Sequence, residues 1–188
     1  MCLNPIKVVI TGGPCVGKTA LINHLNSLEF LCFPEVIREF TLAETKQKEG
    51  IPLQSNPIVF AEDALGFNSM LIKQRTAQYN MSLTKEDPVA FFDRGLPDVI
   101  AYMDFFNQKV PDHFNTACKD HIYDHVFILP PWKDIYIQDE GRFETFEEAI
   151  HIHDALVTRY SKFEYTPVSV PKDSIVNRVA FILKHLNL

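Results

Sequence analysis

Cysteine is scarce in this sequence, and the few cysteines that are present follow no pattern. Cys2, Cys15, Cys32 and Cys118 are widely separated and form no C-x-x-C pair. This spacing argues against a zinc-binding motif and against a disulfide framework, the two structural roles that patterned cysteines serve. We therefore expect reduced thiols in a protein of the cytoplasm.

The sequence also lacks long apolar runs and an excess of basic residues. No apolar stretch reaches the ~18 residues of a transmembrane helix, and no signal peptide precedes the first apolar run, so we expect neither a membrane span nor secretion. The 18 Lys and Arg residues are outnumbered by 24 Asp and Glu residues, which gives a net charge of −6. Nucleic-acid-binding proteins usually have a basic surface, so this acidic balance makes nucleic acid an unlikely partner.

Apolar material for one compact core is present throughout the chain. Hydrophobic residues make up 46% of the 188 positions, and no repeat, low-complexity block or linker interrupts them. This size is right for one domain and cramped for two. We expect residues 1–188 to form a single domain, and the motif at residues 12–19 predicts that this domain binds a nucleotide.

Residues 12–19 match the pattern G-x-x-x-x-G-K-[ST] of a phosphate-binding loop, or P-loop. Its glycines let the backbone turn so that N–H groups converge on phosphate oxygens at the N-terminus of a helix. Lys18 then reaches the outer phosphates, and the Thr19 hydroxyl binds Mg²⁺. The predicted nucleotide-binding residues are Gly12, Gly13, Pro14, Cys15, Val16, Gly17, Lys18, Thr19 and Ala20.

Short apolar runs alternate with helical patterns along the chain. Strands are expected at 6–11, 30–33, 89–92, 126–129 and 167–170, and helices at 19–28, 35–48, 57–82, 97–107, 112–122, 144–163 and 173–187. This alternation predicts an α/β P-loop NTPase fold, with about five parallel strands and helices on both faces of the sheet. Ligands of such sheets bind at the carboxyl ends of the strands.

Three polar residues follow the predicted strand 89–92. Asp93 stands where P-loop enzymes keep a second anchor for Mg²⁺, although it is also placed to cap the next helix. Arg94 has a planar guanidinium that suits a phosphate or carboxylate of a second substrate, with a structural ion pair as the alternative. Asp98, at the start of the next helix, is grouped with Arg94 as a candidate for substrate binding.

Two further candidates follow the predicted strand 30–33. Glu35 and Arg38 are spaced i and i+3 at the start of a predicted helix, so they project from one face. Glu35 is placed to accept the proton of an attacking hydroxyl, and Arg38 to orient the acceptor. The alternative for Glu35 is simply that a first-turn glutamate stabilises the helix dipole.

A segment at about 132–145 has the composition of a lid. It mixes charged residues, aromatic residues and a glycine between a strand and a helix. Phosphoryl transfer depends on excluding water and on cations brought to the transferred group, which a lid can supply. Arg142 is the first candidate for that cation and Lys133 the second. The alternative is a solvated loop in which Arg142 pairs with Asp139.

Taken together, these motifs resemble a widespread family of small predicted ATPases, usually labelled AAA-type. The resemblance rests on residues 10–19, Pro34–Glu35 with Arg38, 91–98 and 126–132, and extends over nearly the whole chain. That family is similar to the ribosylnicotinamide kinase domain of a bifunctional NAD-biosynthesis regulator and, more distantly, to nucleoside and thymidylate kinases. The resemblance implies a kinase-like core with a P-loop, a strand-end Asp-Arg motif and an arginine-bearing lid.

The preferred hypothesis is a phosphotransferase that binds Mg²⁺ with ATP and acts on a small acceptor carrying a hydroxyl or a phosphate. Its catalytic residues are Lys18, Glu35, Asp93, Arg94 and Arg142; its metal site is Thr19 with Asp93; its acceptor site is Glu35, Arg38, Arg94 and Asp98. The chain has no N-K-x-D string for reading guanine, so ATP is preferred over GTP by default.

The second hypothesis is a nucleotide-dependent switch or slow ATPase or GTPase that signals to a protein or lipid partner. The lid segment offers only Arg142 and Lys133 as cations, and this sparseness favours the switch. A ring-forming mechanical ATPase is disfavoured, because a chain of this size leaves no room for a second helical domain. The two hypotheses share the nucleotide site and differ in what faces the outermost phosphate.

Overall fold

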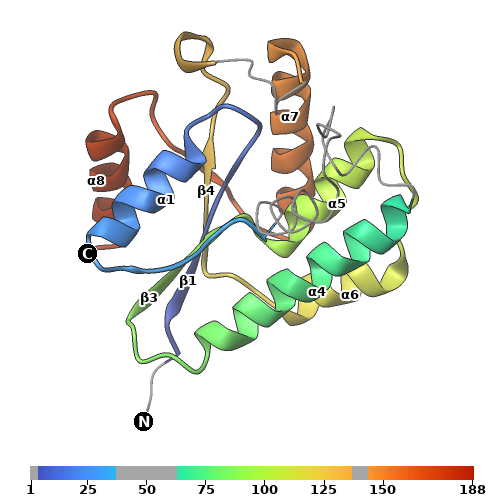
Figure 1. The fold of residues 1–188 in the computed structure, drawn as a ribbon, viewed down its shortest axis with the longest axis horizontal. Coiled ribbons are helices and arrows are strands. Elements are labelled where there is room, and N and C mark those ends of the chain that lie inside the picture. Colours follow the sequence, from blue (N-terminus) through green and yellow to red (C-terminus); the bar gives the residue numbers. More distant parts are fainter. Residues whose placement is uncertain (1–3, 37–62, 137–143) are drawn as a thin grey trace, which may run out of the picture.

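The computed structural model describes residues 4–36, 63–136 and 144–188 (Figure 1). Its centre is a five-stranded sheet of order β2-β3-β1-β4-β5 in which all four strand pairs are parallel. The strands are β1 (Ile6–Gly12), β2 (Leu31–Phe33), β3 (Val89–Asp93), β4 (His125–Leu129) and β5 (Val168–Ser169). The predicted α/β fold with a five-stranded parallel sheet is confirmed.

Helices connect the strands where the apolar periodicity predicts them. They are α1 (Lys18–Ser27), α4 (Ala64–Ser82), α5 (Leu96–Phe105), α6 (Asp112–Asp120), α7 (Phe146–Lys162) and α8 (Ile175–His185), with a short 3₁₀ helix η1 (Lys133–Ile135). Most of the predicted helix 35–48, and residues 57–62 of the predicted helix 57–82, lie outside the described residues. None of the described helices is both long and apolar enough to cross a membrane.

The helices cover both faces of the sheet (Figure 1). Val8 and Ile10 of β1 pack with α1 and α8, whereas Val9 between them packs with α4, α5, α6 and α7. This alternation follows from the two-residue repeat of a strand, and burial on both faces explains why apolar residues stand at successive positions of the strands. Neighbouring strands divide the same way, with Phe91, Phe127 and Leu129 toward α1 and α8, and Ala90, Phe92, Val126 and Ile128 toward the other face.

The strand order decides which loops meet. β1 is central, and its register against β3 pairs Ile10 with Asp93. β2 lies on the other side of β3, with Phe33 opposite Phe92. The chain segments that leave the carboxyl ends of β1, β2 and β3 therefore begin beside one another, as expected for a ligand site in a parallel sheet.

Candidate functional site

The P-loop leaves β1 through backbone conformations that favour glycine. Gly12 and Gly17 have φ of 146° and 86°. A Cβ on Gly12 would stand 2.7 Å from the carbonyl oxygen of Leu129, so no side chain fits there without movement of the backbone. Gly17 is the N-cap of α1, which begins at Lys18. The loop therefore ends at a helix N-terminus, where backbone N–H groups and the helix dipole favour an anion.

Lys18 folds back over the beginning of the loop. Its Nζ donates to the carbonyl oxygens of Gly12 and Gly13, at 2.9 and 2.6 Å. Burial lowers the pKa of the Lys18 ammonium to about 7, and the positive charge of Arg94 also lowers it. The nearby carboxylates act to raise this pKa but do not outweigh the two lowering effects. An anion placed beside Lys18 would relieve both effects, because it would favour the protonated form.

Arg94 reaches the same loop carbonyl from β3. Its Nη1 lies 3.2 Å from the Gly12 oxygen and 3.1 Å from Oδ1 of Asp98, and its guanidinium forms an ion pair with Glu35. The backbone is in the left-handed region, with φ of 77°, and its N–H donates to the carbonyl of Ile10. Lys18 and Arg94 thus bring two positive charges to one oxygen of the P-loop.

Glu35 is held between two arginines. One carboxylate oxygen accepts from Nη2 of Arg75 at 3.0 Å, and the other pairs with Arg94. The Glu35 side chain is only 11% exposed. This geometry gives Glu35 a defined part in positioning Arg94; the prediction that it also accepts a proton stays a prediction.

Arg75 is a site residue that sequence reasoning missed. It projects from α4, is 3% exposed, and its Nη1 donates to the Gly95 carbonyl at 2.8 Å. The signal was available, because Arg75 stands four positions after Leu71 and three after Ile72, both buried. A charged residue on the apolar stripe of a helix is unusual unless it has a buried partner.

Asp98 completes this cluster from the first turn of α5. Its carboxylate accepts from Thr11 Oγ1 and Tyr160 Oη, both at 2.5 Å, and from the Gly95 N–H at 3.0 Å. Burial acts to raise the pKa of Asp98, but Arg94, Arg75 and these hydrogen bonds outweigh it and lower the pKa. Because the carboxylate is 1% exposed, the structure gives it a positioning part; its predicted contact with substrate stays a prediction.

Asp93 ends β3 beside the P-loop and is 5% exposed. The N-cap of α5 is Gly95, so the alternative that Asp93 caps this helix is wrong. Thr19 lies in the first turn of α1. A hydroxyl and a carboxylate are oxygen ligands that suit Mg²⁺, which keeps most of its coordination for waters and phosphates. No group of three or more acidic, His or Cys side chains capable of holding a metal occurs in the described part of the chain.

The predicted lid is described at its two ends only. Trp132 Nε1 donates to Asp134 at 3.0 Å, and the Tyr136 hydroxyl donates to the Glu144 carbonyl. The rings of Tyr136 and Phe146 stand edge to face, with centroids 5.3 Å apart. The two ends of the segment therefore meet at its base. Arg142, and Arg38 of the acceptor site, lie outside the described residues.

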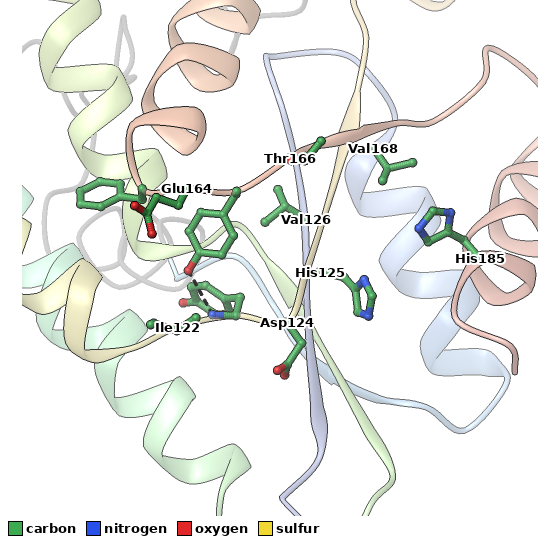
Figure 2. Close-up of a pocket in the computed structure, with 11 residues that line it drawn as sticks. Ile122, Asp124, His125, Val126, Glu164, Thr166, Val168 and His185 are labelled. Atoms are coloured by element: carbon green, nitrogen blue, oxygen red, sulfur yellow. Dashed lines mark hydrogen bonds between the residues drawn. The ribbon is translucent and has the colours of Figure 1, made fainter.

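A cavity of about 570 Å³ lies elsewhere, at the amino end of β4 (Figure 2). It is lined by residues such as Asp124, His125, Glu164 and His185, and the Tyr123 N–H donates to the Tyr165 hydroxyl at its wall. Because the P-loop and Asp93 follow the carboxyl ends of β1 and β3, this cavity is at the opposite edge of the sheet. The strand-end cluster around Lys18 and Arg94 is the candidate site.

A family model described as AAA domain matches residues 7–178. No curated protein matches the sequence.

Solved structures of other proteins share the fold. The NadR protein in complex with NAD and AMP-PNP has a TM-score of 0.70 at 14% identity, over 98% of this chain and 50% of NadR. The present chain thus spans about half the length of NadR. Thymidylate kinase from Ehrlichia chaffeensis has a TM-score of 0.64 at 15% identity, over 98% and 100% of the two chains. Deoxyadenosine kinase from M. mycoides with bound dATP has a TM-score of 0.62 at 15% identity, over 97% and 100%. The chain therefore has a kinase-like P-loop fold.

Proposed function

This chain belongs to the AAA domain family, and we propose that it is a phosphotransferase that uses Mg²⁺ with ATP and acts on a small acceptor bearing a hydroxyl or a phosphate. One observation carries the proposal: the side chains of Lys18 and Arg94 converge on the Gly12 carbonyl, at 2.9 and 3.2 Å. Two cations at one loop oxygen suit a polyanion whose outer phosphate lies between them. The AMP-PNP and dATP bound by two proteins of the same fold support this use of the loop.

The nucleotide side follows from the geometry of the loop. Backbone N–H groups of Gly13 and of residues 15–19 would surround the phosphates, and Lys18 would neutralise charge on the transferred group. Thr19 and Asp93 would hold Mg²⁺, Asp93 through water. When bound, this ion neutralises phosphate charge and orients the outer phosphates.

The acceptor side is the cluster of Glu35, Arg75, Arg94 and Asp98. Its two carboxylates and two guanidiniums balance in charge and are linked by ion pairs and hydrogen bonds into one buried unit. Arg94 would contact the acceptor or the transferred phosphoryl, since it is the member that also reaches the P-loop. Glu35 would accept the hydroxyl proton once an acceptor displaces part of its ion pair. Arg38 and Arg142 are proposed to orient the acceptor and to close over the transferred group.

The experiment that tests this function is acceptor-dependent release of the nucleoside diphosphate, ADP from ATP or GDP from GTP. The purified protein is incubated with Mg²⁺ and ATP, or in parallel GTP, and with a panel of nucleosides, nucleotides and phosphorylatable vitamins. We expect one acceptor class to raise the rate at least tenfold over the rate without acceptor. A rate of diphosphate release that no acceptor changes would contradict the transferase. If the protein also bound a partner only in the presence of ATP while hydrolysis stayed slow, the switch would be established instead.

Changing Asp93 to Asn tests the metal site. Asn keeps the shape of the side chain but removes the charge that orients metal-bound water, so we expect nucleotide affinity to be retained and turnover at saturating Mg²⁺ to fall about 10- to 100-fold. Asp120→Asn, on the exposed end of α6, makes the same change at the surface and should leave turnover unchanged. Full activity of Asp93→Asn over a Mg²⁺ titration would refute the assignment.

A further inference from the structure

Arg178 is a buried cation with no acidic partner among the residues that the structure describes. It projects from α8, is 1% exposed, and its Nη2 donates to the Val16 carbonyl of the P-loop at 3.0 Å. Its Nε and Nη1 make no hydrogen bond, and no ion pair of Arg178 occurs within the described residues. Burial without a counterion lowers the pKa of this guanidinium. A buried charge in this state is costly unless an anion completes its surroundings.

The guanidinium is placed against the P-loop backbone itself. A Cβ built on Gly17 would stand 2.9 Å from Nη1 of Arg178, so only glycine lets the arginine approach this closely. The Arg178 guanidinium also lies 5.8 Å from the ring of Trp132, the first residue of the lid segment. Arg178 therefore occupies the junction of the P-loop, the start of α1 and the base of the lid.

Lys18 and Arg178 approach the loop from different ends. Lys18 bonds to the carbonyls of Gly12 and Gly13, next to β1, whereas Arg178 bonds to Val16 and adjoins Gly17, next to α1. In a P-loop the lysine takes the outer phosphates of the nucleotide. The phosphate that remains for a cation at the other end of the loop is the one that carries the sugar and base.

We propose that Arg178 is a nucleotide-binding residue that donates to the base-proximal phosphate of the nucleotide in the P-loop. This inference rests on the proposed nucleotide site. The free donors Nε and Nη1 would then gain charge-assisted hydrogen bonds, and the anion would compensate the buried charge. The contact would link α8 to the bound nucleotide. It would also add a cation to a site for which the lid segment supplies few.

The test compares Arg178→Met with the wild type in calorimetric titrations of ATP and of inorganic tripolyphosphate. Tripolyphosphate has no base, so it separates a phosphate contact from a base contact. We expect Arg178→Met to weaken both ligands about 10- to 100-fold, the usual effect of losing a charge-assisted hydrogen bond. Arg159→Met is the matched control, because Arg159 pairs with Asp104 on α5 rather than at the loop, and it should bind both ligands normally.

Ionic strength supplies a readout that a merely structural arginine would not change. The wild type should lose affinity for tripolyphosphate more steeply with salt than Arg178→Met, since one phosphate contact is absent in the variant. Arg178→Lys keeps the charge and the aliphatic stem; it should fold where the Met variant does not, bind three- to tenfold more weakly than the wild type, and keep the salt dependence. Trp132, the single tryptophan of the chain, gives an independent fluorescence signal for the same titrations.

The outcomes separate this inference from the proposed function. If the wild type binds neither ligand, the nucleotide site itself is wrong. If the wild type binds both ligands and the Arg178 variants bind them equally well, only the role of Arg178 is overturned. Weaker ATP binding with unchanged tripolyphosphate binding would also overturn it, because Arg178 would then contact the base.

Discussion

Replacing Lys18 with alanine is expected to lower ATP affinity about 100-fold and turnover by about 10²- to 10³-fold. The physical reason is the loss of the ammonium that lies over Gly12 and Gly13, where the outer phosphates are proposed to bind. The pKa of Lys18 is lowered to about 7 by burial and by repulsion from Arg94, so the fold holds this charge at a cost. Truncation relieves that repulsion, and the variant should keep its melting temperature to within a few degrees.

The matched control is Lys85→Ala, which changes net charge equally at an exposed position near the amino end of β3. It should bind ATP like the wild type. Calorimetry at constant ionic strength measures both variants, and circular dichroism confirms their folding. Wild-type affinity in a folded Lys18→Ala protein would mean that residues 12–19 do not bind the nucleotide.

The sheet could be predicted almost completely because its strands are buried on both faces. The run from Val89 to Phe92 is apolar at every position, which is typical of a strand covered by helices on both sides. Short apolar and β-branched runs located the other four strands to within two residues at each end. The first residue of helix α4 was harder to predict. The helix begins at Ala64, and the side chain of Asp63 caps it by accepting a hydrogen bond from the Gly66 N–H.

The cluster at the strand ends could be predicted only in part. Sequence position identifies Glu35, Asp93 and Arg94 as neighbours, because carboxyl ends of parallel strands share an edge of the sheet. It does not say which of them bind one another, since ion pairing depends on side-chain directions across a crossover. The sequence leaves a structural ion pair as the alternative role of Arg94. The structure shows that ion pair, with Glu35, together with the contact of Arg94 to Gly12.

Two arginines from distant helices could not be placed by strand-end reasoning. Arg75 and Arg178 belong to α4 and α8, and each points from its helix toward residues that follow a strand. The only signal they leave is a charge on a stripe of apolar residues: Arg178 precedes the buried Val179 and stands four positions before Ile182. Such a signal indicates a buried partner but not its identity, which requires the fold.

Replacing Asp98 with asparagine is expected to lower the free energy of unfolding by about 3–5 kcal/mol. The carboxylate is the acceptor for Thr11 and Tyr160 and the partner of Arg94, all within the buried cluster. An asparagine there removes the negative charge beside Arg94 and turns an N–H₂ group toward hydroxyl and backbone donors. Chemical denaturation monitored by circular dichroism measures the change.

A matched control for Asp98→Asn is Asp104→Asn, the same substitution on the same helix, where the carboxylate pairs with Arg159 and is 37% exposed. Exposed pairs contribute at most about 1 kcal/mol, so the free energy of unfolding of this variant should be close to that of the wild type.

The pKa of Asp98 is lowered by Arg94 in the folded state, so the stabilisation by its carboxylate is present above pH ~4 and is lost as pH falls through that lowered pKa. The gap between the wild type and Asp98→Asn should accordingly stay constant from pH 5 to pH 8, on the order of the full effect, and narrow below pH ~4. A gap that is absent at neutral pH would show that the carboxylate does not stabilise the cluster and that Glu35 and the Gly12 carbonyl are enough to position Arg94.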